Sequence, residues 1–279
     1  MIKSISYWSF DGGLEGTLPI RDAMLQAKKA GFEAIELCFA AKGVLSPRTT
    51  EKQCRQILAD AKKIGIRLPS LCTGMYWDYS LTDDKASVRK KAYELTVAYI
   101  KAAKMLKVKH VLVVPGAVDV FFKPDFKKVP YEVVWKRSVQ QLRKLARVAQ
   151  KHKVYLCVEN VWNKFLLSPV EMKCFLDAVG SPWVGCYFDV GNIMLYGFPQ
   201  QWIRYLGSRI KRIHFKDFKT SVGTVAGFCD LLAGDVPFAE VMKAFRAVGY
   251  DGPCTAEMMP PDPTLLKRTS KAMDKIFTM

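Results

Sequence analysis

The sequence lacks the features of a membrane or secreted protein. No stretch holds enough uninterrupted apolar residues to cross a bilayer. The first eight residues, MIKSISYW, have the pattern of a β-strand and not that of a secretory signal peptide. Neither a Pro/Gly/Ser-rich linker, a low-complexity segment nor a repeat divides the chain. We therefore expect a cytoplasmic protein without membrane contact, folded as one domain over residues 1–279.

Cysteine motifs are also missing. The chain has eight cysteines but no Cys-x-x-Cys pair, which argues against a thiolate zinc site. Five of the cysteines fall in or at the ends of expected core strands, and without a secretory signal we expect them to be reduced, buried thiols. These are Cys38, Cys72, Cys157, Cys186 and Cys254.

Acidic residues are scarce. With 26 of them against 43 lysines and arginines, the formal net charge is +17. Such a charge favours an anionic partner, namely a phosphorylated substrate, a nucleic acid or an anionic surface. Much of it, however, lies on the segment Lys136–Lys153, where Val139, Leu142, Ala146 and Ala149 form an apolar stripe opposite the basic residues. We favour a solvated helix face and expect no nucleic-acid partner.

What the sequence does contain is a long alternation of short β-rich runs and amphipathic helices. Eight of each predict an α/β fold of the (β/α)₈ TIM-barrel type, with a doubly wound open sheet as the alternative. The open sheet would usually carry a glycine-rich phosphate loop after its first strand, and Asp11-Gly12-Gly13 fits neither common form of that loop. The expected strands are 2–9, 34–39, 67–73, 110–115, 154–159, 184–189, 210–216 and 253–257. The expected helices are 18–30, 51–64, 86–106, 133–151, one opened by Ser168-Pro169, one from Pro199, 238–248 and 263–277.

Four successive expected strands end in a residue that can bind a metal: Glu159, Asp189, His214 and Glu257. The C-terminal strand ends form the active face of a (β/α)₈ barrel. Each residue alone is explained by an ion pair, a capped loop or a buried hydrogen bond, but four at matching depth favour one site. Three carboxylates and one imidazole suit Mn²⁺, Mg²⁺ or Co²⁺, and also accommodate Zn²⁺. The barrel core below this site is expected to be apolar.

Further candidates follow from strand alternation. Lys216 shares a strand face with His214, so it is placed to bind a substrate oxygen or phosphate, although an ion pair with Asp217 is an equal alternative. Glu36 shares a face with Cys38 and either contacts substrate or anchors the barrel. The aromatic residues Trp8, Tyr76 and Trp77 either wall the pocket or pack structurally. The lysines after the fourth strand form a solvated loop or a lid: Lys123, Lys127 and Lys128.

Several sequence pieces together resemble a known family. They are Val158-Glu159-Asn160, Tyr187-Phe188-Asp189-Val190-Gly191-Asn192, His214-Phe215-Lys216-Asp217, Ala233-Gly234-Asp235-Val236-Pro237-Phe238 and Ala256-Glu257-Met258. They resemble the xylose-isomerase-like TIM-barrel sugar isomerases and epimerases, most closely the ketopentose-phosphate 3-epimerases. The resemblance implies that the four strand-end residues bind one divalent metal, with manganese the first expectation, and that Glu159 and Glu257 also act as acid and base.

Two departures leave the substrate open. Free-ketose 3-epimerases of this family carry a histidine where this chain has Asn192, which we expect to face the substrate. The phosphate-sugar epimerases carry a basic cluster after the third strand, where this chain has Met75-Tyr76-Trp77. We expect C3 epimerisation of a ketose or ketose phosphate by a homo-oligomer, a dimer or tetramer.

Alternative functions remain open at this point. An aldose–ketose isomerase or a polyol or keto-acid dehydratase would use the same scaffold. An apurinic-endonuclease-like phosphodiesterase is less well supported, because such enzymes hold three zinc ions with several histidines and this chain has one well-placed histidine, His214. A non-catalytic binding barrel is the remaining class, and a bound stoichiometric metal would argue against it.

Overall fold

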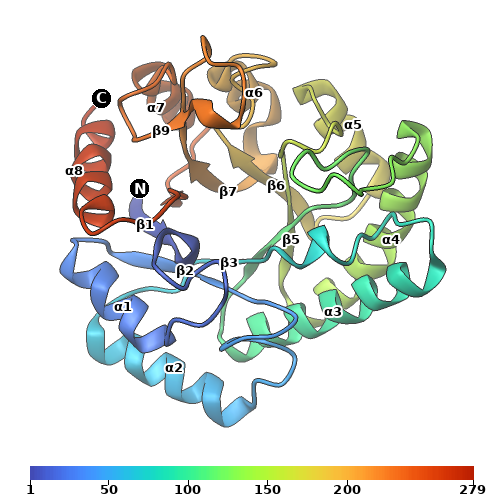
Figure 1. Cartoon of the computed structure of the whole chain (residues 1–279), viewed down its shortest axis with the longest axis horizontal. Helices are drawn as coiled ribbons and strands as arrows, with labels where there is room; N and C mark the ends of the chain where they lie inside the picture. The colour runs from blue at the N-terminus through green and yellow to red at the C-terminus, as the bar shows by residue number, and fades with distance from the viewer.

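The computed structural model describes all 279 residues and confirms the barrel. Eight parallel strands close in the order β1-β10-β7-β6-β5-β4-β3-β2 (Figure 1). The barrel closes where β10 pairs with β1, with Ile2 opposite Pro253 and Ile5 opposite Ala256. The barrel strands are β1 (Ile2–Ser6), β2 (Ala34–Cys38), β3 (Leu71–Cys72), β4 (His110–Val113), β5 (Tyr155–Glu159), β6 (Val184–Asp189), β7 (Ile210–Phe215) and β10 (Pro253–Ala256).

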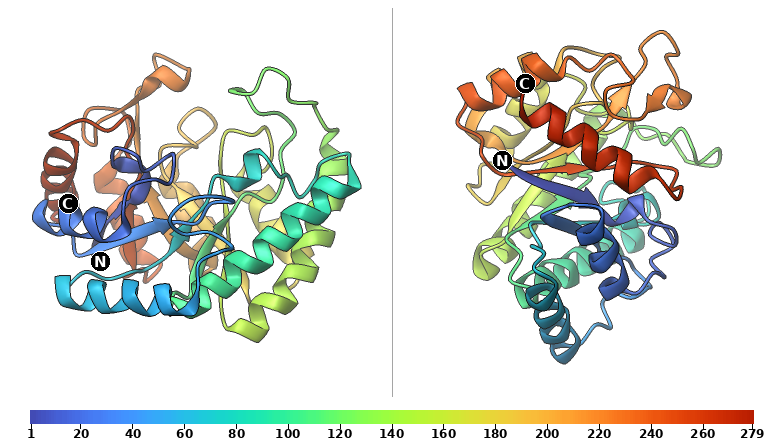
Figure 2. Two further views of the ribbon diagram at one scale, coloured as in Figure 1. Left: turned by 60° about the horizontal axis from the view of Figure 1, so that its bottom comes forward. Right: turned by 90° about the vertical axis from the view of Figure 1, so that its left-hand side faces the viewer.

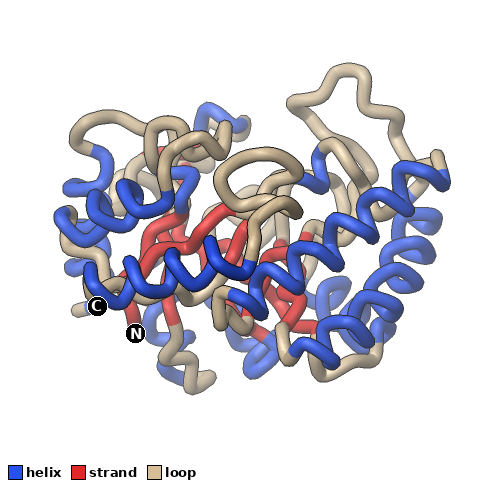
Figure 3. The backbone as a smooth tube through the Cα atoms, turned by 90° about the horizontal axis from the view of Figure 1, so that it is seen from below, coloured by secondary structure: helices blue, strands red, loops and turns tan.

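Eight helices surround the strands, as Figure 3 shows in blue around red. The expected opening at Ser168-Pro169 is confirmed, because Ser168 and Glu171 form a reciprocal capping box. A second capping box joins Thr50 and Gln53. The helices are α1 (Ile20–Lys29), α2 (Glu51–Ile64), α3 (Ala86–Met105), α4 (Tyr131–His152), α5 (Pro169–Val179), α6 (Pro199–Leu206), α7 (Phe238–Ala247) and α8 (Leu265–Phe277). None of them is both long and apolar enough to cross a membrane.

The first and third strands are shorter than expected. The chain leaves β1 after Ser6 because the Ser6 hydroxyl accepts a hydrogen bond from the Trp8 amide and starts the short 3-10 helix Tyr7–Ser9. The third strand pairs only over Leu71–Cys72, while Arg67 makes an isolated bridge to Ala34. At the end of β1 the Ser6 hydroxyl thus competes with the strand ladder for the backbone.

An unexpected feature is a two-stranded antiparallel hairpin after β7. Its strands are β8 (Asp217–Phe218) and β9 (Phe228–Cys229). Strands of two residues carry too little alternation to be recognised in a sequence. The loop between β4 and α4 is the other long excursion and projects beyond the barrel (green, Figure 2 left). Both features extend the barrel on the side of the strand C-termini.

The expectation of an apolar barrel interior is wrong. The apolar core lies mainly between the strands and the helices, where the stripe Val139, Leu142, Ala146 and Ala149 is buried as expected. The inside of the barrel instead holds fully buried polar side chains, of which Ser70 donates a hydrogen bond to Glu36, whereas Ser4 and Thr255 have no hydrogen-bond partner. Strand alternation accounts for two of them, because Ser4 and Ser6 are two residues apart in β1 and share one face. These buried polar side chains are Ser4, Ser6, Glu36, Ser70 and Thr255. All eight cysteines are free thiols, and the five expected core cysteines are buried.

Candidate metal centre

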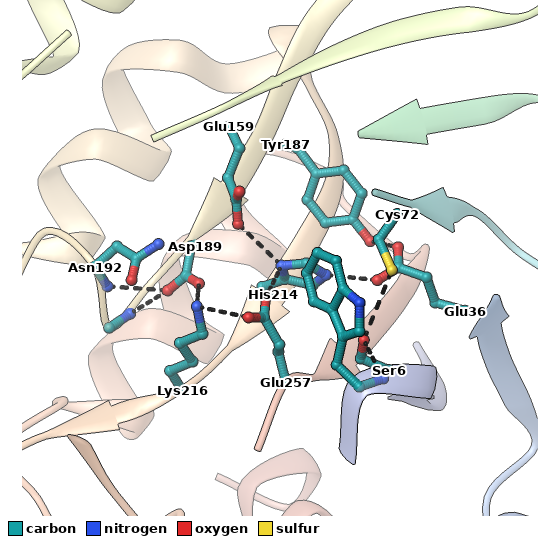
Figure 4. Close-up of polar contacts among 12 residues, drawn as sticks. Ser6, Glu36, Cys72, Glu159, Tyr187, Asp189, Asn192, His214, Lys216 and Glu257 are labelled. Atoms are coloured by element: carbon teal, nitrogen blue, oxygen red, sulfur yellow. Dashed lines mark hydrogen bonds and ion pairs between the residues drawn. The ribbon is translucent and has the colours of Figure 1, made fainter. Parts of the chain in front are cut away.

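The structure brings together the four residues expected to bind a metal (Figure 4). Glu159, Asp189, His214 and Glu257 are buried, and one ligand atom from each lies within 4.8 Å of the others. Their strands, β5, β6, β7 and β10, are consecutive in the barrel. Asp189 and His214 are register partners on neighbouring strands, which sets them at the same depth. No second group of three or more His, Cys, Asp or Glu side chains with this spacing exists in the chain.

His214 stands at the centre of the group and is held from both sides. Its Nδ1 lies 3.1 Å from Glu159 Oε1 and 2.7 Å from Glu257 Oε2. Its Nε2 lies 2.8 Å from Glu36 Oε1. We assign the proton on Nε2 to this bond, so that Nδ1 faces the two glutamates and becomes a metal ligand when it loses its own proton. A metal-binding histidine commonly donates its second N–H to a carboxylate in this way.

Glu36 therefore supports the imidazole and does not line the cavity above it. Its Oε2 accepts hydrogen bonds from the Ser70 hydroxyl at 2.7 Å and from the Tyr187 hydroxyl. The carboxylate is fully buried with both oxygens occupied. The sequence left two roles for Glu36, contact with substrate or anchoring of the barrel. These contacts argue against substrate contact and favour anchoring.

The donor set fits a divalent cation. Asp189 Oδ1 accepts hydrogen bonds from the Gly191 and Asn192 amides, both at 2.9 Å, which fixes the carboxylate. Asp189 Oδ2 and Glu257 Oε2 are buried and have no partner with hydrogen-bond geometry, although each lies near a charged nitrogen. Buried carboxylate oxygens normally have donors, so two such oxygens within one group of potential ligands fit the coordination of a divalent cation.

Lys216 points into the site, as strand alternation predicts. Its Nζ lies 3.0 Å from Asp189 Oδ2 and 3.0 Å from Glu257 Oε1. The alternative ion pair with Asp217 is wrong, because Asp217 accepts hydrogen bonds from the backbone amides of Gly234 and Val236 at 3.0 and 3.1 Å. Lys216 thus balances part of the negative charge of the group.

The environment separates the two cavity glutamates electrostatically. Burial raises the pKa of Glu159 to about 7, although His214 opposes the shift. Burial also acts to raise the pKa of Glu257, but Lys216 and His214 outweigh it and lower that pKa to about 2. For His214, burial lowers the pKa, yet Glu36 and Glu257 raise it well above its ordinary value. The metal-free site therefore holds one protonatable and one ionised glutamate.

A cavity of about 1150 Å³ opens above the four residues. Glu159, Glu257, Asn192 and Lys216 form its floor, and Trp8 and Trp77 stand in its wall, as expected for a substrate site. The Trp8 indole donates to Cys38 Sγ at 3.1 Å. Tyr76 does not line the cavity, because its hydroxyl is buried against Thr96 Oγ1 at 3.1 Å. Two of the loop lysines are engaged in ion pairs, Lys123 with Asp78 and Lys127 with Asp84.

Sequence reasoning missed two kinds of residue. Asn160 accepts a hydrogen bond from the Asp189 amide at 2.9 Å and donates to the Asp189 carbonyl at 2.8 Å, so it clamps that strand end. Its position directly after Glu159 was the available signal. Phe121, Phe122 and Trp162 line the cavity from loops, where sequence periodicity gives no indication of direction.

Comparison with known proteins agrees with this architecture. The chain is 25% identical over 255 residues to the putative L-ribulose-5-phosphate 3-epimerase SgbU of Escherichia coli (strain K12), covering 89% of this chain and 87% of that protein. It is 24% identical over 254 residues to the L-ribulose-5-phosphate 3-epimerase UlaE of Escherichia coli (strain SMS-3-5 / SECEC), covering 88% and 86%. Among solved structures, the D-psicose 3-epimerase of Clostridium cellulolyticum H10 superposes with a TM-score of 0.80 at 20% identity, covering 99% of this chain and 98% of that one.

A family model agrees over nearly the whole length of the chain. The model of the xylose isomerase-like TIM barrel matches residues 24–276, a segment that includes all four residues of the candidate metal centre. With the closed barrel of eight parallel strands, this match shows that the chain belongs to the xylose isomerase-like TIM barrel family.

Proposed function

We propose that this protein is a metal-dependent sugar epimerase that inverts C3 of a ketose. One observation carries the proposal: two glutamates with separated pKa values, about 7 for Glu159 and about 2 for Glu257, face one cavity beside a group of metal-binding side chains. Pairs of carboxyl groups whose environments separate their pKa values are typical of acid–base enzymes. The relatives named as 3-epimerases support the choice of reaction.

The two glutamates come from opposite sides of the group. β5 and β10 are separated in the barrel by β6 and β7, so Glu159 and Glu257 approach the same space from different strands. His214 Nδ1 lies between them, within 3.1 Å of one and 2.7 Å of the other. A sugar carbon placed above this point would have one carboxyl group on each face. That arrangement suits inversion and not proton transfer on a single face.

Glu159, Asp189, His214 and Glu257 would hold the cation, and manganese, magnesium and cobalt match this donor set. A divalent cation bound there would polarise the ketose carbonyl and so make the C3 hydrogen more acidic. Glu257, which is ionised, removes the C3 proton. Glu159, whose pKa of about 7 lets it carry a proton near neutral pH, then donates that proton to the opposite face. After this step Glu257 carries the proton and Glu159 is ionised. Proton exchange with solvent restores the starting states, or the reaction proceeds in the reverse direction from the other epimer.

Other residues of the site position the substrate. Lys216 contributes a cation beside the reacting carboxylates and is placed to bind a substrate hydroxyl. Asn192 lines the cavity with its side-chain amide held by the Asn160 carbonyl at 3.0 Å. Trp8 and Trp77 offer flat apolar walls, against which the C–H faces of sugars stack.

The proposal is tested by following ketoses in D₂O with NMR. Metal-free protein, checked by elemental analysis, is reloaded with Mn²⁺, Co²⁺ or Mg²⁺ and incubated with L-ribulose, D-fructose and D-psicose. We expect metal-dependent deuterium incorporation at C3 together with the C3 epimer. Exchange at C1 without epimer formation would instead identify an aldose–ketose isomerase, and equal activity in the verified metal-free protein would exclude the metal-dependent reaction.

A further inference from the structure

The cavity above the candidate metal centre is larger and more apolar than a monosaccharide requires. Its volume of about 1150 Å³ exceeds the range of about 300–1,000 Å³ that holds drug-sized ligands. A single sugar is smaller than such ligands. Of the 29 lining residues, 19 are hydrophobic, whereas the hydroxyl groups of a sugar need polar partners. Part of the cavity is therefore available to something other than the reacting sugar.

The excess space is bounded by five aromatic side chains that we call the aromatic arc. It comprises Trp77, Phe122, Phe121, Trp162 and Phe228, all of which line the cavity. Consecutive rings of the arc lie close together, with centroid distances of 5.3 Å, 5.1 Å, 6.0 Å and 5.2 Å along the series. The rings come from four different excursions of the chain, after β3, β4 and β5 and within the β8–β9 hairpin. They therefore form one continuous wall.

The outer rings of the aromatic arc are exposed to solvent, and the inner ring, Trp162, is held by a hydrogen bond beside the candidate metal centre. Phe121 and Phe122 are 52% and 48% exposed. Trp162 is half-buried, and its indole N–H donates to the Asn192 carbonyl at 2.7 Å. The Asn192 backbone amide in turn donates a hydrogen bond to Asp189 Oδ1 at 2.9 Å. The wall thus begins beside the reacting carboxylates and runs outward to solvent, which is the course expected for a substituent attached to the sugar.

The charges in the cavity argue against a phosphate as that substituent. No arginine lines the cavity, and its only lysines are Lys42 and Lys216. Lys216 is neutralised by Asp189 and Glu257. Lys42 is exposed and makes no ion pair that would orient it. A phosphate is normally held by several charge-assisted hydrogen bonds, and the cavity offers no such cluster.

We propose that the substrate is a ketose carrying an uncharged aromatic substituent, and that the aromatic arc binds this substituent. Stacked and edge-to-face contacts with the five rings supply its affinity. The sugar end of the substrate rests on the function proposed above, whereas the binding of the aromatic end is independent of it. A second copy of this chain could also cover exposed rings, and the test below separates that occupant.

The test compares three ligands that differ at one carbon: D-fructose, its 6-O-benzyl ether and D-fructose 6-phosphate. Dissociation constants for Mn²⁺-loaded protein are measured by calorimetry and tryptophan fluorescence. These measurements report binding and do not depend on turnover. We expect the benzyl ether to bind about 10- to 100-fold more tightly than D-fructose, as burial of one aromatic ring implies. The phosphate should bind no more tightly than D-fructose. Equal affinities, tighter binding of the phosphate, or no detectable binding of the benzyl ether would overturn the proposal.

A matched pair of variants locates the effect. Phe121→Ala combined with Phe122→Ala should bring the affinity ratio of benzyl ether to D-fructose toward one. Phe198→Ala is the control, because this phenylalanine is 58% exposed but lies outside the cavity. It should keep the ratio of the unaltered protein. If the double variant instead leaves the ratio unchanged and dissociates an oligomer in sedimentation, the rings form an interface between copies and the proposal is wrong.

Hydrogen exchange at C3, measured on the same three ligands, separates this inference from the proposed function. Tight binding of the benzyl ether without exchange from any ketose would retain the aromatic site and reject the epimerase. Exchange from all three at equal affinity would retain the epimerase and reject the aromatic site.

Discussion

Glu36 Oε1 lies 2.8 Å from His214 Nε2, on the edge of the imidazole that faces away from the two cavity glutamates. The contact joins β2 to β7 across the inside of the barrel. It fixes the ring in the orientation that presents Nδ1 to the candidate metal position. The buried polar layer inside the barrel therefore serves the site, because Ser70 and Tyr187 hold the other oxygen of Glu36.

The first prediction concerns Glu36→Gln. The amide keeps the size of the side chain and an oxygen acceptor but loses the negative charge opposite His214. Loss of such a supporting group typically weakens metal affinity about 10- to 100-fold. Metal titration of the folded variant, with circular dichroism to confirm the fold, measures the change. Glu33→Gln is the control, since Glu33 is exposed at the other end of the same strand region. Unchanged affinity in Glu36→Gln would remove the supporting role.

Metal binding should release protons and strengthen with rising pH. The pKa of His214 is raised well above its ordinary value in the metal-free protein, and the pKa of Glu159 is raised to about 7. His214 therefore carries a second proton near neutral pH that a cation bound at Nδ1 must displace, so affinity rises with increasing pH. Calorimetry in buffers of different ionisation enthalpy measures the released protons. A binding enthalpy independent of the buffer, with affinity constant from pH 6 to 8, would contradict this assignment.

Gly191 explains part of the motif around Asp189. A Cβ atom at this position would lie 2.7 Å from Lys216 Cβ and 3.1 Å from the Lys216 carbonyl carbon. Neither neighbour is the flexible end of a side chain, so Gly191→Ala must displace the end of β7. We expect overpacking to lower the free energy of unfolding by about 1–3 kcal/mol. Epimerase activity of the folded variant should also fall, because Asp189 and Lys216 belong to the site. Gly197→Ala in the same loop is the control, because its nearest neighbour would be Trp202 Nε1 at 3.3 Å. Thermal unfolding and epimerase rates are measured for both variants. Equal losses in Gly191→Ala and Gly197→Ala would contradict the prediction.

The parts of this molecule that obey a periodic rule could be predicted from the sequence. Strand alternation placed His214 and Lys216 on one face, and the position of a strand end fixed the depth of Glu159 and Asp189. Glu36 illustrates the limit: alternation directed it into the barrel, but only the positions of Ser70 and Tyr187 show that it lies beneath the imidazole. A polar interior was not anticipated, because a serine inside a strand gives no indication of its partner.

The aromatic arc shows a second limit. Phe121 and Phe122 lie in a loop without periodicity, and their direction depends on contacts with Trp77 and Trp162 from other loops. Those contacts join residues far apart in the chain, so no local pattern contains them. Of the two alternatives for Lys216, the ion pair with Asp217 was wrong for the same reason: its partners are Asp189 and Glu257, which lie far from it in the sequence.

The last prediction separates acid–base chemistry from metal binding. Glu159→Gln and Glu257→Gln preserve size and one oxygen donor but remove the group that transfers a proton. General acid–base catalysis contributes about 10²- to 10⁴-fold, so epimerisation by each variant should fall at least that far when metal occupancy is kept equal. Glu240→Gln, on the exposed side of α7, is the control.

The two variants should also differ from each other. Glu257 serves one C3 epimer as the base and Glu159 serves the other, so each variant should still exchange hydrogen slowly from the one epimer that its remaining glutamate can deprotonate. Deuterium exchange followed separately from D-fructose and D-psicose measures this asymmetry. Near-normal epimerisation by either metal-loaded variant, or exchange from both epimers in both variants, would show that one base suffices. In that case the separated pKa values of Glu159 and Glu257 would have no role in proton transfer, and a one-base isomerisation would replace inversion at C3.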